Sequence, residues 1–188
     1  MLACTLDLET TGFEADYNII LCAVLKPFTR DNDGKHFILR ADDYSTWNTT
    51  RSCDAPLCRD LHKEVVKYDI IVAHNGVRFD VPFMMARLLK WGIEWGQPKV
   101  VDPVRISRRY LKLGSNSLKS VTHHFGIQGK TECEGDIWME AKFDKGKGNK
   151  EAMDYVVEHC IADVDILERV TLKVKHLVPK ISNFGSDT

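Results

Sequence analysis

Three segments of the sequence each place an acidic residue beside an expected change in backbone structure. These acids are the first candidates for chemistry. The first segment is Asp7-Leu8-Glu9-Thr10-Thr11-Gly12, at the end of an apolar stretch. Alternate residues of a strand share one face, so Asp7 and Glu9 would lie side by side. Acids are poor strand formers and repel each other on a buried face. A cation between them would relieve this repulsion, whereas an exposed edge strand with solvated acids is the simpler alternative.

The second segment, His74 to Met84, has the sequence HNGVRFDVPFM. It follows an apolar strand, and Asp80 stands directly before a predicted helix whose early Pro82 suits a first turn. Asp80 could serve only as the N-cap of that helix. Phe79 offers an aromatic face, and Asn75 offers a donor and an acceptor. Both are useful for contacting a terminal nucleotide.

The third segment lies in the last predicted helix. With ~3.6 residues per turn, Asp163 falls at the edge of an apolar stripe, and His159 lies one turn earlier on the same edge. The stripe consists of Met153, Val156, Val157, Cys160, Ile161, Val164 and Leu167. Asp154, Glu158 and Asp165 are expected to face water, so Asp163 is the stronger candidate for a functional acid. An ordinary helix-surface pair of His159 and Asp163 is the alternative.

These segments need a framework that brings them together. The apolar patterns predict strands at 2–9, 18–26, 35–39, 69–73 and 100–101, and helices at 59–67, 81–91, 117–125 and 150–175. Turn residues at 31–34 predict that the first three strands are antiparallel. Residues 42–58 and 126–150 are expected to be irregular, and the tail from Ile181 to be frayed. Three strands followed by alternating helix and strand indicate an α/β protein with a mixed sheet.

Length and composition are typical of one domain, because 188 residues with 44% apolar content can fill a single core. The net charge of −1 neither supports nor excludes nucleic acid. If four carboxylates bind metal, basic residues outnumber acidic ones on the remaining surface. Met1–Leu8 reaches a carboxylate before any apolar leader, and no apolar run approaches membrane-spanning length. We therefore expect an intracellular protein without a membrane partner, located in the cytoplasm, the nucleoid or the cytoplasm of a host cell.

The six cysteines are Cys4, Cys22, Cys53, Cys58, Cys133 and Cys160. Several fall inside expected strands and helices, so most are predicted to be reduced core residues. The loose spacing of Cys53, Cys58 and His62, with Cys133 as a fourth ligand, leaves a structural zinc as an alternative role.

Together, the three acidic segments resemble the motifs of the DEDD superfamily of 3′→5′ exonucleases, to which the proofreading domains of DNA polymerases belong. DLETTG matches the first motif, HNGVRFDVPFM the second and HCIADV the third. The second is closest to the proofreading domains of family B DNA polymerases. The resemblance runs from Leu2 to about Leu167, with weaker matches at Val101-Asp102, 118–127 and Trp138.

The resemblance implies a ribonuclease H-like fold with a mixed five-stranded sheet, in which three antiparallel strands precede the parallel ones and helices flank the sheet. It also implies that residues 1–188 form a single exonuclease domain. Such a domain would hydrolyse terminal phosphodiesters of single-stranded nucleic acid, with DNA favoured, to nucleoside 5′-monophosphates. An exoribonuclease of the same fold and a catalytically silent nucleic-acid-binding module are the alternatives.

The resemblance also assigns roles to residues. Asp7, Glu9, Asp80 and Asp163 would hold two divalent cations, Mg²⁺ or Mn²⁺, which prefer carboxylate oxygens. Asp7 would bridge both ions, Glu9 and Asp163 would complete one site, and Asp80 would support the other through water. His159 would accept the proton of the attacking water. The family has either a tyrosine four residues before the last aspartate or a histidine five before it, so His159 occupies the tyrosine position.

The expected substrate is a single-stranded 3′ end. Phe79 and Phe13 would contact bases, Asn75 would contact the terminal nucleotide, and backbone amides near Thr10 would meet the terminal ribose. Candidate phosphate contacts are Arg105, Arg108, Arg109, Lys112 and the lysines between 142 and 150, each of which could equally be a solvated surface charge. Replication or repair proteins acting in trans are possible partners.

Overall fold

A mixed sheet of five strands forms the centre of the fold. A computed structural model describes residues 1–28, 34–129, 136–143 and 147–177. Its strands are β1 (Ala3–Thr10), β2 (Ile20–Pro27), β3 (Phe37–Arg40), β4 (Ile70–Val72) and β5 (Lys99–Val101), in the spatial order β3-β2-β1-β4-β5. The first three strands are antiparallel, and β4 and β5 run parallel to β1. The predicted α/β architecture with a mixed sheet is confirmed.

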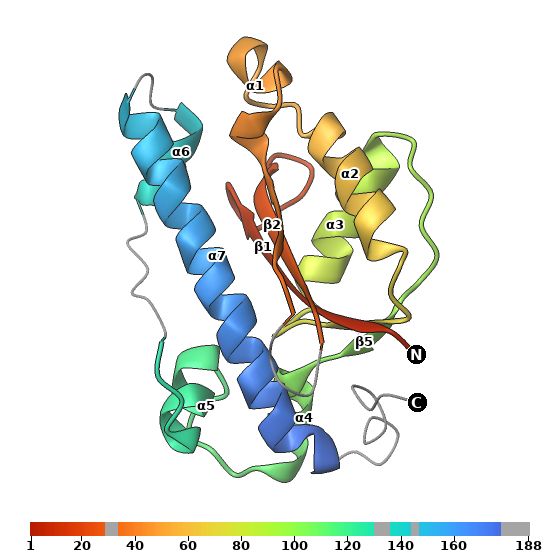
Figure 1. Cartoon of the computed structure of the whole chain (residues 1–188), viewed down its shortest axis with the longest axis vertical. Helices are drawn as coiled ribbons and strands as arrows, with labels where there is room; N and C mark the ends of the chain where they lie inside the picture. Colours follow the sequence, from red (N-terminus) through yellow and green to blue (C-terminus); the bar gives the residue numbers. More distant parts are fainter. Residues whose placement is uncertain (29–33, 130–135, 144–146, 178–188) are drawn as a thin grey trace.

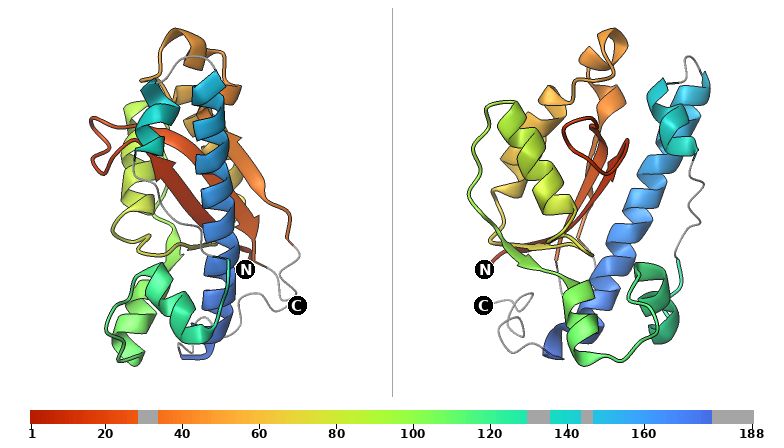
Figure 2. Two further views of the ribbon diagram at one scale, coloured as in Figure 1. Left: turned by 90° about the vertical axis from the view of Figure 1, so that its left-hand side faces the viewer. Right: turned by 180° about the vertical axis from the view of Figure 1, so that it is seen from behind.

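Helices cover both faces of this sheet. They are α1 (Thr46–Thr49), α2 (Ala55–Val65), α3 (Asp80–Lys90), α4 (Pro103–Tyr110), α5 (Leu118–Phe125), α6 (Ile137–Phe143) and α7 (Lys147–Val174), with 3₁₀ turns η1 (Ala41–Asp43) and η2 (Lys175–Leu177). Helices α2 and α3 lie on one face, and the long α7 crosses the other (Figures 1 and 2). Within the described ranges, no helix has both the length and the apolar character needed to cross a membrane.

The alternation along β1 directs its acids toward α7. Ala3 packs in one buried cluster with Leu167 and Val174 of α7. Because side chains two residues apart share a face, Asp7 and Glu9 lie on this same face. The strand is covered on both sides for most of its length, since Ala3, Cys4, Thr5 and Leu6 are all buried. The predicted placement of both acids on one face of a strand agrees with this arrangement.

Helix α7 packs against the sheet through the predicted apolar stripe. Six of the seven stripe residues are buried, and only Ile161 is half-exposed. The helix lies mainly against β1 and β2. Burying large apolar side chains contributes roughly 1.5–3 kcal/mol each, so this stripe is a major source of stability.

The other side of α7 differs from the prediction. Asp165 was expected to face water but pairs with Lys26 Nζ at 2.8 Å and His36 Nε2 at 2.9 Å. Asp154 pairs with Arg40 Nη2 at 2.7 Å. Both side chains remain partly exposed, at 43% for Asp154 and 31% for Asp165, but they also pair with basic residues of β2, β3 and the adjoining segment, which the prediction did not include. Glu158 is exposed, as predicted.

Several short helices were also not expected from the sequence. Helix α2 begins at Ala55, four residues before the predicted start, with a proline in its first turn. Residues 42–58 contain α1 and part of η1 in place of irregular chain, and α4 and α6 were missed entirely. Helices this short depend on packing against other elements, which local patterns do not reveal. The predicted frayed tail from Ile181 and most of the predicted turn at 31–34 lie outside the described residues.

Candidate active site

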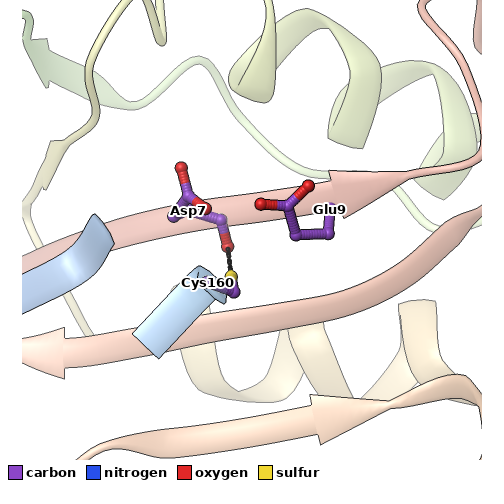
Figure 3. A group of neighbouring side chains, drawn as sticks. All are labelled: Asp7, Glu9 and Cys160. Carbon is purple, nitrogen blue, oxygen red and sulfur yellow. Dashed lines mark hydrogen bonds between the residues drawn. The ribbon is translucent and has the colours of Figure 1, made fainter. Parts of the chain in front are cut away.

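The first two acids, Asp7 and Glu9, lie on the central strand of the sheet. Their carboxylates and the Cys160 thiol of α7 lie within 4.8 Å of one another (Figure 3). Cys160 Sγ also donates a hydrogen bond to the backbone oxygen of Asp7 at 3.4 Å, which joins α7 to β1 at this point. A strand with fully solvated acids is therefore excluded, because Asp7 and Glu9 are only partly exposed and α7 covers their face of β1 at Cys160.

Asp80 reaches β1 because β4 is short. β4 pairs with β1 only from Ala3 to Thr5, so the following residues of β1 have no strand partner on that edge. Asp80 Oδ1 accepts a hydrogen bond from the backbone N–H of Leu8 at 3.2 Å. The N-cap position of α3 is Phe79, whose side chain makes no cap hydrogen bond, and Asp80 is the first helical residue. The N-cap alternative for Asp80 was therefore wrong, and its carboxylate binds the strand that carries Asp7 and Glu9.

The loop between β4 and α3 has a tightly defined backbone. Asn75 adopts the left-handed conformation with φ 62°. A Cβ at Gly76 would come within 2.3 Å of Ala73 Cβ, so only glycine fits there. Asp102, directly after β5, accepts hydrogen bonds from the N–H groups of Asn75 and Val77 at 3.0 and 3.4 Å. The end of β5 thus holds the loop that leads to Asp80.

His159 and Asp163 project from α7 toward the acid-bearing strand. They are 6% and 8% exposed, respectively. His159 Nε2 lies 3.8 Å from Asp163 Oδ2. A solvated helix-surface pair is excluded by this burial, and Asp163 lies within electrostatic reach of Asp7.

The electrostatics of the site indicate crowded carboxylates. The pKa of Asp7 is held well above its usual range by burial and by the negative charges of Glu9, Asp80 and Asp163. The pKa of Asp80 is raised to about 7, mainly by burial and also by Asp102, although the hydrogen bond from Leu8 opposes this. Asp80 of α3 and Asp163 of α7 therefore lie within electrostatic reach of Asp7, whereas among the described residues the ligand atoms of Asp7, Glu9 and Cys160 are the ones grouped within 4.8 Å. Four oxygen-donor carboxylates with unfavourable mutual repulsion are a donor set that fits hard divalent cations.

Trp138 of α6 is the principal site neighbour whose role was not predicted. Its indole Nε1 donates a hydrogen bond to Glu9 Oε2 at 2.6 Å. Its ring meets His159 edge-on with a centroid distance of 5.4 Å, and meets Tyr155 in the same manner at 6.2 Å. Trp138 was only a weak match to the family pattern, and the segment around it was expected to be loop. The residue contacts both an acid and the histidine of the site.

A pocket of about 350 Å³ opens beside these groups. Its lining residues are Leu8, Glu9, Thr10, Thr11, Gly12, Phe13, Phe79, Trp138, Met139 and His159. Phe13 is 82% exposed, and its ring contacts Phe79 edge-on with a centroid distance of 6.0 Å. Thr10, Phe13 and Phe79 are thus brought together with Glu9 and His159. Asn75 is not among these residues and lines a neighbouring pocket with arginine side chains.

The turn after β1 shapes the rim of this pocket. Thr10 Oγ1 donates to the backbone oxygen of Gly12 at 2.7 Å. A Cβ at Gly12 would meet the Asn18 side chain at 2.7 Å, so glycine permits the close approach of these two segments. Arg87 of α3 donates to the backbone oxygen of Ala15 at 2.9 Å, which ties the following loop to the helix layer.

The alternative zinc site receives no support from the described residues. Among them, Asp7, Glu9 and Cys160 form a group with ligand atoms within 4.8 Å, whereas Cys53, Cys58 and His62 do not. Burial raises the pKa of the Cys58 thiol, which favours the neutral form. The prediction of reduced core cysteines is confirmed for Cys4, Cys22, Cys58 and Cys160, which are buried free thiols. Cys133 lies outside the described residues.

Comparisons with known proteins agree with this architecture. Residues 4–175 match the sequence profile of the RNase H superfamily, and the chain therefore belongs to that superfamily. The chain is also similar to a PolC-type DNA polymerase III of Ureaplasma parvum, with 36% identity over 70 residues, 37% of this chain and 5% of the polymerase. The match thus covers only a small part of the polymerase.

A solved structure has the same fold. The family B DNA polymerase of the hyperthermophilic archaeon Pyrobaculum calidifontis superposes with a TM-score of 0.65 and 15% identity, over 99% of this chain and 27% of the polymerase. At this identity the likeness concerns the fold. The expected ribonuclease H-like fold is confirmed, and both matches are consistent with an exonuclease domain of the polymerase type.

Proposed function

We propose that this chain is a metal-dependent 3′→5′ exonuclease that removes nucleoside 5′-monophosphates from single-stranded nucleic acid, with DNA favoured. The observation that carries the proposal is the placement of acids around one strand. Asp7 and Glu9 lie side by side on β1, Asp80 of α3 accepts the Leu8 N–H of the same strand, and Asp163 of α7 is within electrostatic reach of Asp7. Membership of the RNase H superfamily supports a nuclease in general. The similarity to proteins named as DNA polymerases supports DNA as substrate and a role inside the cell with replication or repair partners.

Asp7, Glu9, Asp80 and Asp163 would hold two divalent cations, Mg²⁺ or Mn²⁺. When bound, the cations would activate the attacking water and neutralise charge on the scissile phosphate. The chain's own residues supply position and proton transfer. Asp80 is oriented by the Leu8 N–H, and Glu9 is oriented by the indole of Trp138.

His159 is the proposed general base. Its Nε2 atom accepts the proton of the attacking water, a general-base role that imidazole commonly performs in enzymes. The imidazole is fixed between Trp138, which meets its ring edge-on, and Asp163, which lies 3.8 Å from Nε2. Support for a histidine at this position comes from its burial and its place on the rim of the pocket.

The pocket beside Glu9 and His159 would hold the terminal nucleotide. Phe13 and Phe79 present aromatic faces on which a base can stack, an interaction worth about 1–3 kcal/mol per base. Thr10 and the backbone of the following turn would contact the ribose. Stacking is tolerant of base identity, so digestion is expected to show little sequence preference.

We also propose that residues 1–188 form one exonuclease domain. In support, β1 near the start of the described chain and α7 near its end contribute to the same buried cluster.

Digestion of a 5′-labelled single-stranded DNA tests the proposal. With Mn²⁺, a 3′→5′ exonuclease gives a ladder of shortening labelled products, whereas the opposite polarity releases labelled mononucleotide at once. Chelator and Asp7→Asn should each abolish the ladder. A chain that binds the DNA but yields no product with either metal would be a silent binding module. Matched RNA in the same assay distinguishes an exoribonuclease.

A further inference from the structure

Four arginines line a second pocket, which shares with the catalytic pocket the loop that carries Phe79. The pocket measures about 500 Å³, within the ~300–1,000 Å³ typical of ligand sites. Arg78 of the loop and Arg105, Arg108 and Arg109 of α4 contribute to its lining. Arg105 and Arg109 also line an adjoining pocket of about 390 Å³. We refer to this region as the arginine pocket.

The charge of the arginine pocket is not neutralised by neighbouring acids. Asp102 is the acidic residue in the lining, and its two oxygens accept backbone N–H groups of Asn75, Val77 and Val104. All four arginines are exposed. Among the ion pairs of the described residues, none includes any of the four. Several cations facing one pocket repel one another, so an anion would be bound favourably.

The arginine pocket adjoins the catalytic pocket through one short loop. Asn75, Val77 and Arg78 line the arginine pocket, and Phe79, the next residue, lines the pocket that holds Glu9 and His159. Asp102 fixes this loop and also caps α4 through its bond to Val104. Consecutive residues of one loop thus line the two pockets.

We propose that the arginine pocket binds backbone phosphates of the substrate strand on the 5′ side of the terminal nucleotide. Guanidinium groups form bidentate hydrogen bonds with phosphate, and they do so without reading the base. The inference rests on the proposed function, because the direction of the strand follows from a 3′ end in the catalytic pocket. In this proposal the arginines of α4 and its neighbouring loop contribute to substrate affinity, whereas residues of β1, α3 and α7 carry out the cleavage.

Binding without cleavage tests this assignment. The affinity of wild-type chain for a fluorescein-labelled oligodeoxythymidylate is measured by anisotropy across a salt series in chelator, so that no product forms. Each phosphate contact contributes a slope of about −0.7 in log affinity against log salt for single strands. Arg105→Ala and Arg109→Ala should each reduce the slope by about 0.7, and the double variant by about 1.4.

Matched variants separate this role from a general effect of charge. Arg59→Ala removes an exposed arginine from α2, on the other side of the sheet from α7, and should leave the slope unchanged. Arg105→Lys and Arg109→Lys keep the charge and should retain most of the wild-type slope. If the alanine variants bind with the wild-type affinity and slope, the arginine pocket is a solvated surface and the inference is overturned.

Cleavage of a long and a short substrate distinguishes this inference from the proposed function. The Arg105→Ala/Arg109→Ala variant should have a raised KM on the long oligonucleotide and unchanged kcat/KM on a dinucleotide, whose single internucleotide phosphate is the scissile one. An equal loss of kcat/KM on both substrates contradicts the inference. A wild-type chain that binds the oligonucleotide with the expected slopes but cleaves neither substrate contradicts the proposed function alone.

Discussion

His159 is the residue on which the proposed chemistry depends most directly. His159→Ala should slow cleavage by about 10²–10⁴-fold, the usual contribution of a general base. Mn²⁺ affinity, measured by calorimetry, should change little because the carboxylates remain. Tyr155→Phe is the matched control, since Tyr155 also contacts Trp138 but lies one turn before His159 in α7. A His159→Ala enzyme that cleaves at the wild-type rate would remove His159 as the base.

Trp138 is expected to act by positioning Glu9. Trp138→Phe keeps an aromatic ring against His159 but removes the indole N–H that Glu9 accepts at 2.6 Å. Loss of such a supporting hydrogen bond typically weakens metal affinity or activity by about 10–100-fold. Calorimetric titration with Mn²⁺ measures this change, and Trp95→Phe serves as a control outside the pocket. Equal Mn²⁺ affinity and activity in Trp138→Phe and wild type would show that the hydrogen bond has no functional role.

The sequence predicted these residues unevenly. Asp7, Glu9, Asp80 and Asp163 could be selected because each acid interrupts or borders an apolar pattern, and such interruptions require a partner. The contacts of Trp138 could not be predicted, because a tryptophan in an expected loop carries no signal of what its indole meets. The contacts of Asp102 could not be predicted either, because its carboxylate accepts a backbone N–H from a loop more than twenty residues earlier in the chain.

A buried ion pair joins β2 to α7. Lys26 Nζ lies 2.8 Å from Glu168 Oε2, and the two side chains are 3% and 0% exposed. Lys26→Met should destabilise the chain by about 3–5 kcal/mol, because Glu168 loses its buried cation. Urea denaturation measures the change. Lys63→Met in α2 is the control, since Lys63 is 74% exposed in its pair with Asp60 and should contribute less than about 1 kcal/mol. Similar losses of unfolding free energy in both variants would contradict a special contribution of the buried pair to stability.

Long elements with strong periodicity were predictable, and short ones were not. The strands β1 to β3 and the helices α3, α5 and α7 all carry clear patterns in the sequence. Helices α4 and α6 are eight and seven residues long, below the length at which a helix is stable alone. They form because α6 packs on α7 and α4 begins with the Asp102 cap. The helices that the sequence did not predict are α4, which carries three arginines of the arginine pocket, and α6, which carries Trp138. Their absence from the prediction therefore affected the proposed functional residues more than the overall fold.

The crowded carboxylates should make the stability of the whole chain depend on pH and metal. Asp7 and Asp80 have raised pKa values in the folded chain, with that of Asp80 at about 7. Between about pH 4 and about pH 7 the folded chain binds more protons than the unfolded chain, so stability falls as pH rises. In chelator, Tm should be roughly 5–10 °C lower at pH 8 than at pH 5 because of these groups.

Divalent cations should restore the stability that the folded chain loses at high pH. Mn²⁺ should raise Tm strongly at pH 8 and less at pH 5, because the ligands must be deprotonated to bind. Thermal unfolding followed by circular dichroism provides the measurement. Asp7→Asn/Asp80→Asn is the control and should have a flatter pH profile in chelator. An unchanged profile in this variant would show that other groups determine the pH dependence.

The separation of the site residues along the chain has a consequence during protein synthesis. Asp7 and Glu9 leave the ribosome well before His159 and Asp163, which belong to α7, the helix that covers one face of the sheet. A nascent chain that ends before α7 has an uncovered apolar sheet and lacks both the proposed base and one acid. The proposed nuclease would therefore stay inactive beside the messenger RNA and ribosomal RNA that surround it until translation has passed Asp163.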